Sequence, residues 1–318
     1  MARIAVTDGM AEAAVQMLVK AGHEVDLEPK QLDGFDAVVI RSATKMTTDA
    51  IANAPSLQLI GRAGVGVDNI DLDAATEAGI LVCNTPGSST QSVVELTIGH
   101  LLASIRHIPI ADRNLRNGQW TKKSLKGTEL SGKRIGFIGF GRIAQGVGRV
   151  ASALGMELHA YDPYLPVELA VEQNCELHSD VEDLFRLCTH IAVHCNLTDE
   201  THHLVDLRTL SLMPGIGADG IACGNHLVSC ARGGVVNEDD ALQALDDGIL
   251  STCALDVFES EPETSHEILQ HTNFHGTPHI GAATYEAQER IGFEMANLLL
   301  TFFNGDIPKS VVNKTVLE

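Results

Sequence analysis

The chain has 318 residues, of which 44% are hydrophobic, 20% charged and 4% aromatic, and its formal net charge is -20. This length and composition suggest a globular protein with two domains and a cleft between them. The acidic surplus and the scarcity of aromatic residues argue against binding to nucleic acid or to an anionic membrane surface, so an anionic ligand needs a local cluster of basic side chains.

The first hundred residues alternate short apolar runs, at 4–6, 37–40, 57–60 and 80–83, with helical stretches. This alternation indicates βαβ units and a parallel sheet. The chain enters the first strand directly, without the apolar core and cleavage site of a signal peptide. No apolar run approaches the roughly 20 residues of a membrane helix. We therefore expect a cytoplasmic protein.

The stretch 92–106 is apolar on nearly every face, which is typical of a helix buried between layers or between subunits. Further apolar runs, at 134–138, 158–161, 191–194, 227–230 and 253–255, predict a second doubly wound sheet. A second apolar helix, 287–303, follows this sheet. If that helix packs on the first sheet, the first domain is discontinuous. We predict an α/β protein with one domain over 1–98 and 286–318 and a second over 99–285.

A glycine-rich turn, GFGRIA at 139–144, stands between a strand and a helical pattern, the context that a dinucleotide fingerprint requires. Gly139 permits the tight turn, Gly141 lets a pyrophosphate approach the backbone, and Ala144 replaces the third glycine. Asp162 ends the next strand, 21 residues beyond Gly141. Its carboxylate would accept hydrogen bonds from the adenosine ribose and disfavour a 2′-phosphate. The pattern predicts a Rossmann domain that prefers NAD to NADP.

Three later strand ends carry charged or titratable residues, Arg232, Glu261 and His279. The carboxyl ends of parallel strands meet at one edge of a sheet, so the three side chains should converge where the cofactor binds. His279 would take a hydroxyl proton, and Glu261 would favour the imidazolium form. Arg232 would bind a carboxylate and polarise a keto oxygen. The three residues predict hydride transfer between an alcohol and a ketone.

Other histidines lie in helical or strand patterns without a partner carboxylate motif, and we expect them to be structural: His23, His100, His107, His159, His178, His190 and His194. The seven cysteines are odd in number and scattered, without the paired spacing of a disulfide framework or a zinc site. We therefore expect reduced, mostly buried cysteines and no metal.

The catalytic motifs resemble those of the D-isomer-specific 2-hydroxyacid dehydrogenases, which carry Arg in an Ala-Arg-Gly-Gly turn, Glu before Pro, and His after Pro. The resemblance covers nearly the whole chain and implies an NAD-dependent oxidoreductase with a flavodoxin-like substrate domain. It assigns the catalytic roles to Arg232, Glu261 and His279. It places NAD against Gly139, Gly141, Arg142, Ile143, Asp162, Cys195, Cys230, Ala231, Asp256 and Gly281.

The chain departs from the family pattern twice. Cys195-Asn196 stands where the family usually has Thr-Pro, in a loop that lines the adenine side of the cofactor. Between Pro214 and Arg232 the chain has about nine residues more than the family pattern, in an insertion at 215–226. Loops that enter a parallel strand lie opposite the active edge, so we expect the insertion to lie away from the catalytic residues.

Within this family the chain is most similar to the members that oxidise 3-phospho-D-glycerate to 3-phosphohydroxypyruvate, at the entry to serine synthesis. The similarity lies in 41–45, 61–69 and 120–123. It implies a substrate carboxylate held by backbone N–H groups of Gly64, Val65 and Gly66. The phosphate would be held by Arg41, Arg62 and, from a partner subunit, Lys122.

Two alternatives stay open. A glyoxylate or hydroxypyruvate reductase, or another D-2-hydroxyacid dehydrogenase, would keep the catalytic residues without needing Arg41 and Arg62. An NAD-sensing corepressor would need a peptide-docking groove and disordered tails, which the sequence does not indicate. The helix 92–106 and the loop with Trp120 resemble the family's dimer surface, so we expect a homodimer or a higher homo-oligomer. Because the chain ends soon after its last helix, we expect no serine-sensing domain.

Overall fold

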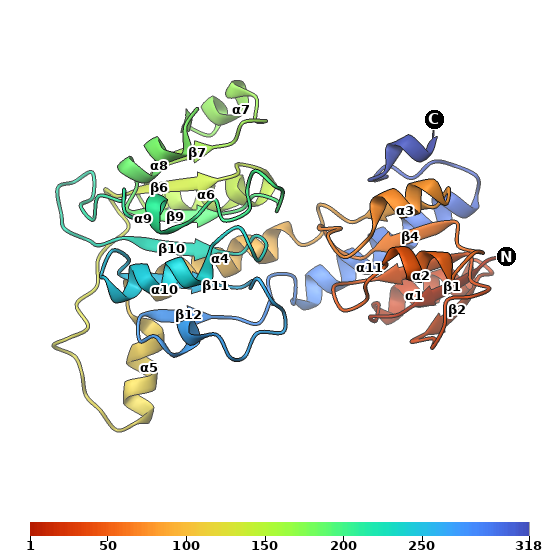
Figure 1. Ribbon diagram of the computed structural model, residues 1–318, viewed down its shortest axis with the longest axis horizontal. Helices are drawn as coiled ribbons and strands as arrows, with labels where there is room; N and C mark the ends of the chain where they lie inside the picture. The colour runs from red at the N-terminus through yellow and green to blue at the C-terminus, as the bar shows by residue number, and fades with distance from the viewer. Residues whose placement is uncertain (318) are drawn as a thin grey trace. The chain divides into compact units, whose positions relative to one another are not determined.

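The computed structural model describes residues 1–317 and divides the chain into two compact units (Figure 1). Unit 1 consists of Met1–Thr90 together with the segment from Ala282 onward, and unit 2 is Gln91–Gly281. The boundaries that the sequence suggested, 98/99 and 285/286, fall inside α4 (Thr90–Ile105) and after the first residue of α11 (Tyr285–Phe303). Each unit is an α/β domain built on a parallel sheet, as predicted.

The sheet of unit 1 has five parallel strands in the order β2-β1-β3-β4-β5, which is the flavodoxin-like order. The strands are β1 (Arg3–Val6), β2 (Glu24–Leu27), β3 (Ala37–Ile40), β4 (Leu59–Arg62) and β5 (Leu81–Asn84). The helices of this unit are α1 (Glu12–Lys20), α2 (Thr48–Ala52), α3 (Leu72–Glu77), α11 and the short 3₁₀ helix η2 (Lys314–Leu317).

Both faces of this sheet are covered, because side chains of a parallel strand point alternately to the two faces. On one face α1 and α11 pack against Ile4, Val39 and Leu59. On the other face α2 and α3 pack against strand residues that include Val38 and Ile60. The return of α11 to the first sheet confirms that this domain is discontinuous in sequence.

The sheet of unit 2 has seven parallel strands in the order β12-β11-β10-β9-β6-β7-β8, a Rossmann arrangement with one additional strand at the β12 edge (Figure 1). The strands are β6 (Arg134–Ile138), β7 (Glu157–Tyr161), β8 (Cys175–His178), β9 (His190–Val193), β10 (His226–Ser229), β11 (Thr252–Leu255) and β12 (Phe274–Gly276). The helices are α4, α5 (Ile108–Arg116), α6 (Arg142–Ala153), α7 (Val167–Glu172), α8 (Val181–Leu187), α9 (Leu207–Leu210), α10 (Glu238–Asp246) and the 3₁₀ helix η1 (Glu267–Gln270).

Two buried clusters flank this second sheet. Helices α4, α6 and α7 cover the face that carries Phe137, Leu158 and Val228. Helices α8, α9 and α10 cover the opposite face, which carries Ile138 and Leu227. The apolar helix predicted over 92–106 is α4, and it contributes Val93, Val94, Leu101 and Ile105 to the first cluster.

Two of the strands were not predicted, and both lie at sheet edges: β2 and β8. An edge strand has a neighbour on one side only, and it therefore buries fewer of its side chains. In β2 no residue is buried, and in β8 only Cys175 is. Their sequences consequently lack the continuous apolar run by which an interior parallel strand is recognised.

The insertion at 215–226 lies at the amino end of β6, opposite the end that carries the glycine-rich turn. Asp219 donates its backbone N–H to the carbonyl of Gly132 (3.1 Å), and its carboxylate binds the ammonium of Lys133 (2.6 Å). An antiparallel bridge between Ile216 and Ala222 closes the insertion. This placement agrees with the expected position away from the catalytic strand ends.

Within residues 1–317, no single helix is long and apolar enough to cross a membrane. The bent pair α4 and α5 passes the same criterion of length and composition only when the two helices are taken together.

Candidate active site

The glycine-rich turn after β6 depends on Gly139 for two reasons. Its φ of +80° lies in the left-handed region, which side chains rarely adopt. A Cβ at this position would also lie 2.9 Å from both the backbone nitrogen and the Cα of Cys195. Any other residue would push the loop after β9 away from the turn. The Cys195 loop therefore borders the predicted cofactor turn, even though its sequence departs from the family pattern.

The N-terminus of α6 is built to receive an anion. Its N-cap is Gly141, which has no side chain to cap the helix. A Cβ on Gly141 would meet no protein atom within 4 Å, so there is open space beside the backbone. Arg142 and Ile143 form the first turn, whose N–H groups lack partners within the helix. This arrangement fits the pyrophosphate of a dinucleotide.

Asp162 follows β7 and has a role that the sequence did not reveal. Its Oδ2 accepts the backbone N–H of Phe140 (2.8 Å), and its Oδ1 accepts that of Tyr164 (3.0 Å). The carboxylate thereby fixes the glycine-rich turn. Each oxygen keeps a further lone pair for a ribose hydroxyl, so this role is compatible with the predicted contact to NAD.

Cys195 follows β9, and Cys230 and Ala231 follow β10, the two strands next to β6 and its glycine-rich turn. Burial raises the pKa of the Cys195 thiol to about 11 and that of the Cys230 thiol to about 12. Both thiols are therefore neutral at physiological pH. Cys230 and Ala231 are 8% and 6% exposed, so they form an apolar floor after β10.

Glu261 and His279 form a hydrogen-bonded pair, as predicted from their motifs. His279 Nδ1 lies 2.7 Å from Glu261 Oε2, and Glu261 Oε1 accepts the backbone N–H of Phe258 (3.1 Å). Burial alone would raise the pKa of Glu261. The two hydrogen bonds and the charges of His279 and Arg232 outweigh burial and hold this pKa below its ordinary value. Glu261 is therefore a carboxylate through the neutral range.

Arg232 joins this pair through a close contact between two strand-end loops. A Cβ at Gly233 would lie 1.8 Å from the carbonyl oxygen of Phe258, so glycine is required for the two backbones to meet. Arg232 Nη1 donates to the carbonyl of Ala231 (2.7 Å), and its charge acts on Glu261. The three predicted catalytic residues thus belong to one electrostatic group.

Asp256 holds the loop that presents His279. The Asp256 carboxylate is buried, and it accepts hydrogen bonds from Thr277 Oγ1 (2.6 Å), Ile280 N (2.8 Å) and Gly281 N (2.9 Å). The backbone N–H of His279 donates to the carbonyl of Asp256 (2.8 Å). His279 itself has a φ of +52°, an uncommon conformation for a residue with a side chain. The contacts around Asp256 compensate for this backbone strain.

Thr277 was not among the predicted site residues. Its hydroxyl donates to Asp256 and lies 3.1 Å from Nε2 of the buried His100, on α4. Burial lowers the pKa of His100, while the charge of Asp256 acts in the opposite direction. The sequence offered one signal for this role. Thr277 lies two residues before His279, where a hydroxyl group can anchor the loop that presents the histidine.

In unit 1, Arg62 is the last residue of β4 and Arg41 directly follows β3. Asp8, which the sequence analysis missed, holds the loop after β3 by accepting the backbone N–H groups of Arg41 (2.7 Å) and Thr44 (3.0 Å). Arg62 lies across Gly64: a Cβ there would be 1.6 Å from Arg62 Nη1. Glycine at position 64 therefore allows the guanidinium to lie beside the glycine-rich backbone.

The remaining predicted substrate residues lie in loops. Val65 and Gly66 continue the turn after β4, and Asn84 Nδ2 donates to the Val65 carbonyl (2.6 Å). In the same turn the backbone N–H of Gly64 donates to the carbonyl of Arg62 (2.8 Å). Lys122 belongs to unit 2 and is exposed in the loop after α5, close in sequence to Trp120, which is 82% exposed.

The histidines outside the catalytic group differ from one another. Burial lowers the pKa of His190 and of His194, the latter to about 4, so both are neutral interior side chains. The expectation that none of these histidines has a carboxylate partner is wrong for His159, whose Nδ1 lies 3.6 Å from Glu176. The seven cysteines are all free, and five of them are buried.

Comparisons with known proteins point to one enzyme family. The family description "D-isomer specific 2-hydroxyacid dehydrogenase, NAD binding domain" matches residues 98–281. D-3-phosphoglycerate dehydrogenase of Methanocaldococcus jannaschii is 41% identical over 98% of this chain, but the chain spans only 60% of that relative's length. Hydroxypyruvate reductase of Thermotoga maritima is also 41% identical, over 92% of this chain and 95% of the reductase.

One similar protein has been solved with its cofactor bound. D-lactate dehydrogenase of Aquifex aeolicus, solved with NAD and lactic acid, has a TM-score of 0.83 and 26% identity, and 96% of each chain is covered. NAD is accordingly the cofactor that the fingerprint, the uncapped helix α6 and the family match all indicate. The chain belongs to the D-isomer-specific 2-hydroxyacid dehydrogenase family.

Proposed function

We propose that the chain catalyses the NAD-dependent oxidation of 3-phospho-D-glycerate to 3-phosphohydroxypyruvate, the reaction that opens serine synthesis. The observation that carries this choice of substrate is the pair of arginines at adjacent strand ends of unit 1. Arg62 ends β4 and Arg41 follows β3, its hydrogen-bonded neighbour. In a chain with a net charge of -20, two such cations favour a substrate with more than one anionic group.

The residues of unit 2 supply the proton and charge chemistry. His279 Nδ1 is engaged by Glu261, so Nε2 is the nitrogen that takes the proton from the C2 hydroxyl. NAD, when bound, accepts the hydride from C2. The carbon–hydrogen and oxygen–hydrogen bonds thus break as the C2–oxygen double bond forms. Arg232 stabilises the developing negative charge on that oxygen, and Glu261 stabilises the resulting imidazolium.

Unit 1 would bind the anionic ends of the substrate. The N–H groups of Val65 and Gly66 would hold the carboxylate, and that of Gly64 would join them on exchanging its bond to the Arg62 carbonyl. The guanidinium groups of Arg41 and Arg62 would hold the phosphate, for which their paired N–H donors are suited. Burial lowers the pKa of Arg41, but Asp8 opposes this effect, and an arginine remains charged in proteins.

A second candidate is a hydroxypyruvate or glyoxylate reductase. It is favoured by the Thermotoga maritima reductase, which matches this chain over 95% of its own length. Such an enzyme would use the same Arg232, Glu261 and His279 but would gain little from the two arginines of unit 1. A corepressor that only senses NAD would produce no NADH with any hydroxy acid.

The test is a steady-state assay of NADH formation with 3-phospho-D-glycerate, D-glycerate, D-lactate and glycolate, and of the reverse reaction with hydroxypyruvate and glyoxylate. We expect the phosphorylated acid to have the highest kcat/KM. Arg41→Ala and Arg62→Ala should each lower this value at least about tenfold, which is the loss of roughly 1.4 kcal/mol of binding. Their effect on D-glycerate should be small.

Arg3→Ala is the matched control, because Arg3 is a half-exposed arginine of the same unit that pairs with Glu24 at 3.5 Å. It should leave all kinetic constants unchanged. If the arginine variants affect D-glycerate and 3-phospho-D-glycerate equally, the phosphate assignment fails and the reductase is favoured.

We also propose that the chain works as a homodimer or higher homo-oligomer in which Lys122 of one subunit serves the other subunit's substrate. Support comes from α5, none of whose residues is buried although it carries Ile108 and Leu115. A helix of nine residues is marginal in water without packing, so this surface is suited to a second copy of the chain.

A further inference from the structure

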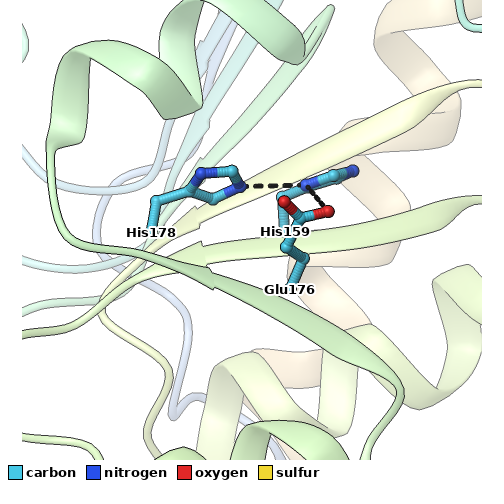
Figure 2. Close-up of side chains that lie close together, drawn as sticks. All are labelled: His159, Glu176 and His178. Carbon is cyan, nitrogen blue, oxygen red and sulfur yellow. Dashed lines mark hydrogen bonds and ion pairs between the residues drawn. The ribbon is translucent and has the colours of Figure 1, made fainter.

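Three side chains that the hydride chemistry does not use lie together at one edge of the unit 2 sheet: His159 on β7, and Glu176 and His178 on β8 (Figure 2). Nδ1 of His159 lies 3.0 Å from Nε2 of His178 and 3.6 Å from Oε2 of Glu176. One potential ligand atom from each residue lies within 4.8 Å of the other two.

Strand pairing places these residues on one face. In the parallel register of β7 and β8, His159 is opposite Glu176 and Tyr161 is opposite His178. Successive side chains of a strand alternate between faces, so 159, 176 and 178 share a face. Their sequence neighbours Leu158 and Leu177 point to the opposite face, where they belong to or pack against the buried cluster of that side. The convergence of the three ligand atoms is thus a consequence of the sheet itself.

The distances suit one shared ion. Bonds of about 2.0–2.1 Å around a tetrahedral ion keep ligand atoms roughly 3.3–3.4 Å apart, and around an octahedral ion neighbouring ligands are roughly 2.9 Å apart. The observed 3.0 Å lies between these two values, and the observed 3.6 Å is slightly longer than the tetrahedral one. The two imidazole rings are inclined at 30°, and Nε2 of His178 faces Nδ1 of His159, beside which the Glu176 carboxylate lies (Figure 2).

The electrostatic setting favours metal binding as well. Burial lowers the pKa of His159, while the charges of Glu176 and Glu157 act in the opposite direction. Arg134 also acts on His159, but it is paired with Glu157 at 2.7 Å. The side chain of Glu176 is 67% exposed, which supplies a negative charge and a route for an ion from solvent.

The nearby thiol does not take part. Cys175 precedes Glu176 on β8 and is therefore directed to the opposite face, where it belongs to the buried cluster of that side. Burial raises the pKa of its thiol to about 12, so it is neither ionised nor placed to bind the same ion. The donor set is two imidazoles and one carboxylate, which suits zinc and similar ions better than magnesium or calcium.

We propose that His159, Glu176 and His178 form a binding site for a divalent transition-metal ion of the zinc class, with water completing the coordination. The ion would join the edge strand β8 to β7. Because Asp162 directly follows β7 and holds the glycine-rich turn, the ion would stabilise the side of unit 2 that carries this turn. The proposal is independent of which hydroxy acid the enzyme oxidises.

The experiment uses the full chain, freed of metal with a chelator and titrated with zinc chloride by calorimetry, with thermal unfolding measured in parallel. We expect one zinc ion per chain at this site and a rise in Tm with zinc concentration. Glu176→Gln and His178→Gln should each weaken this binding at least tenfold and abolish the rise in Tm. Both side chains are at least partly exposed, so the variants should fold.

His271→Gln is the matched control. His271 lies 3.6 Å from Asp246, which is a histidine–carboxylate pair on the same unit but without a third ligand. This variant should bind zinc as the unmodified chain does. Two outcomes would overturn the proposal: no change of Tm with zinc in the unmodified chain, or equal zinc binding by the double variant of Glu176 and His178. In either case the contact between His159 and His178 is only a hydrogen bond.

Discussion

The side chains of His279 and Glu261 are joined by one hydrogen bond of 2.7 Å, between Nδ1 and Oε2. His279 is exposed on one side and held by its backbone in a left-handed conformation, so its ring can face a substrate while its Nδ1 stays with Glu261. The pKa of Glu261 is lowered by His279, the Phe258 N–H and Arg232, against the effect of burial. The carboxylate is therefore charged at every pH at which the enzyme would work.

Replacing that charge without changing the shape is the direct test. Glu261→Gln keeps the shape and one acceptor oxygen of the side chain, but it replaces the second acceptor by an amide donor and removes the charge that stabilises the imidazolium. We expect kcat to fall about 100-fold, the lower end of what general acid–base catalysis contributes. Glu259→Gln, two residues away and paired with His203 at 2.9 Å, should leave kcat unchanged. An unaltered kcat in Glu261→Gln would remove Glu261 from the mechanism.

The same substitution has a defined effect on stability as pH changes. The pKa of Glu261 in the folded protein is lower than the value of about 4.3 expected when unfolded. The stabilisation by its ionised form is therefore fully present above that unfolded value and is lost as pH falls through the lower folded value. Urea unfolding of the unmodified chain and of Glu261→Gln should show a stability difference at pH 6 that shrinks as the pH falls below 4. A difference that does not depend on pH would contradict the ionised state.

Among the elements, strands with a continuous apolar run and their polar ends could be predicted, including the edge strand β5, whereas the edge strands β2 and β8 could not. The glycine-rich turn follows β6, Arg232 follows β10 and Glu261 follows β11, each after an apolar run. Because the carboxyl ends of parallel strands meet at one edge of the sheet, their proximity could be predicted from the sequence. Edge strand β8 has no continuous apolar run, since Cys175 is its one buried residue. The proposed metal ligands Glu176 and His178 lie on that strand, and strand register cannot be read from residue spacing.

The insertion at 215–226 illustrates a contact that is long-range in sequence and therefore was not foreseen. Lys133 is 2% exposed, and its ammonium is paired with Asp219 of the insertion at 2.6 Å. Asp219→Ala would leave a buried ammonium without its partner, which is more destabilising than loss of an exposed pair. We expect Tm to fall by at least about 3 °C. Because this contact is at the amino end of β6, kcat at a temperature where the variant is folded should be unchanged.

A neighbouring ion pair provides the control for this prediction. Arg134, the next residue, pairs with Glu157 at 2.7 Å, but these side chains are 34% and 55% exposed. Glu157→Ala should change Tm very little, because exposed pairs contribute little stability. If Asp219→Ala and Glu157→Ala have equal effects, or if Asp219→Ala lowers kcat in the folded protein, the insertion does not have the structural role described here.

At the scale of the whole molecule, the proposed assembly into a homo-oligomer rests on the surface around α5. This helix buries no residue, Ile108 and Leu115 are 54% and 57% exposed, and Trp120 in the following loop is 82% exposed. Exposed apolar residues that gather on one segment mark an interaction surface more often than scattered ones do. We expect light scattering to give a mass of at least twice that of the single chain.

Placing charges on that surface should separate the subunits and also affect the substrate. Ile108→Asp with Leu115→Asp should yield a monomer, and it should raise KM for 3-phospho-D-glycerate more than for D-glycerate, because Lys122 from the second subunit is lost. Val171→Asp is the matched control, since Val171 is a 66% exposed valine on α7 and should leave mass and kinetics unchanged. A monomeric unmodified chain with full activity would contradict both the assembly and the role of Lys122. A dimeric double variant would show instead that the subunits meet through another surface.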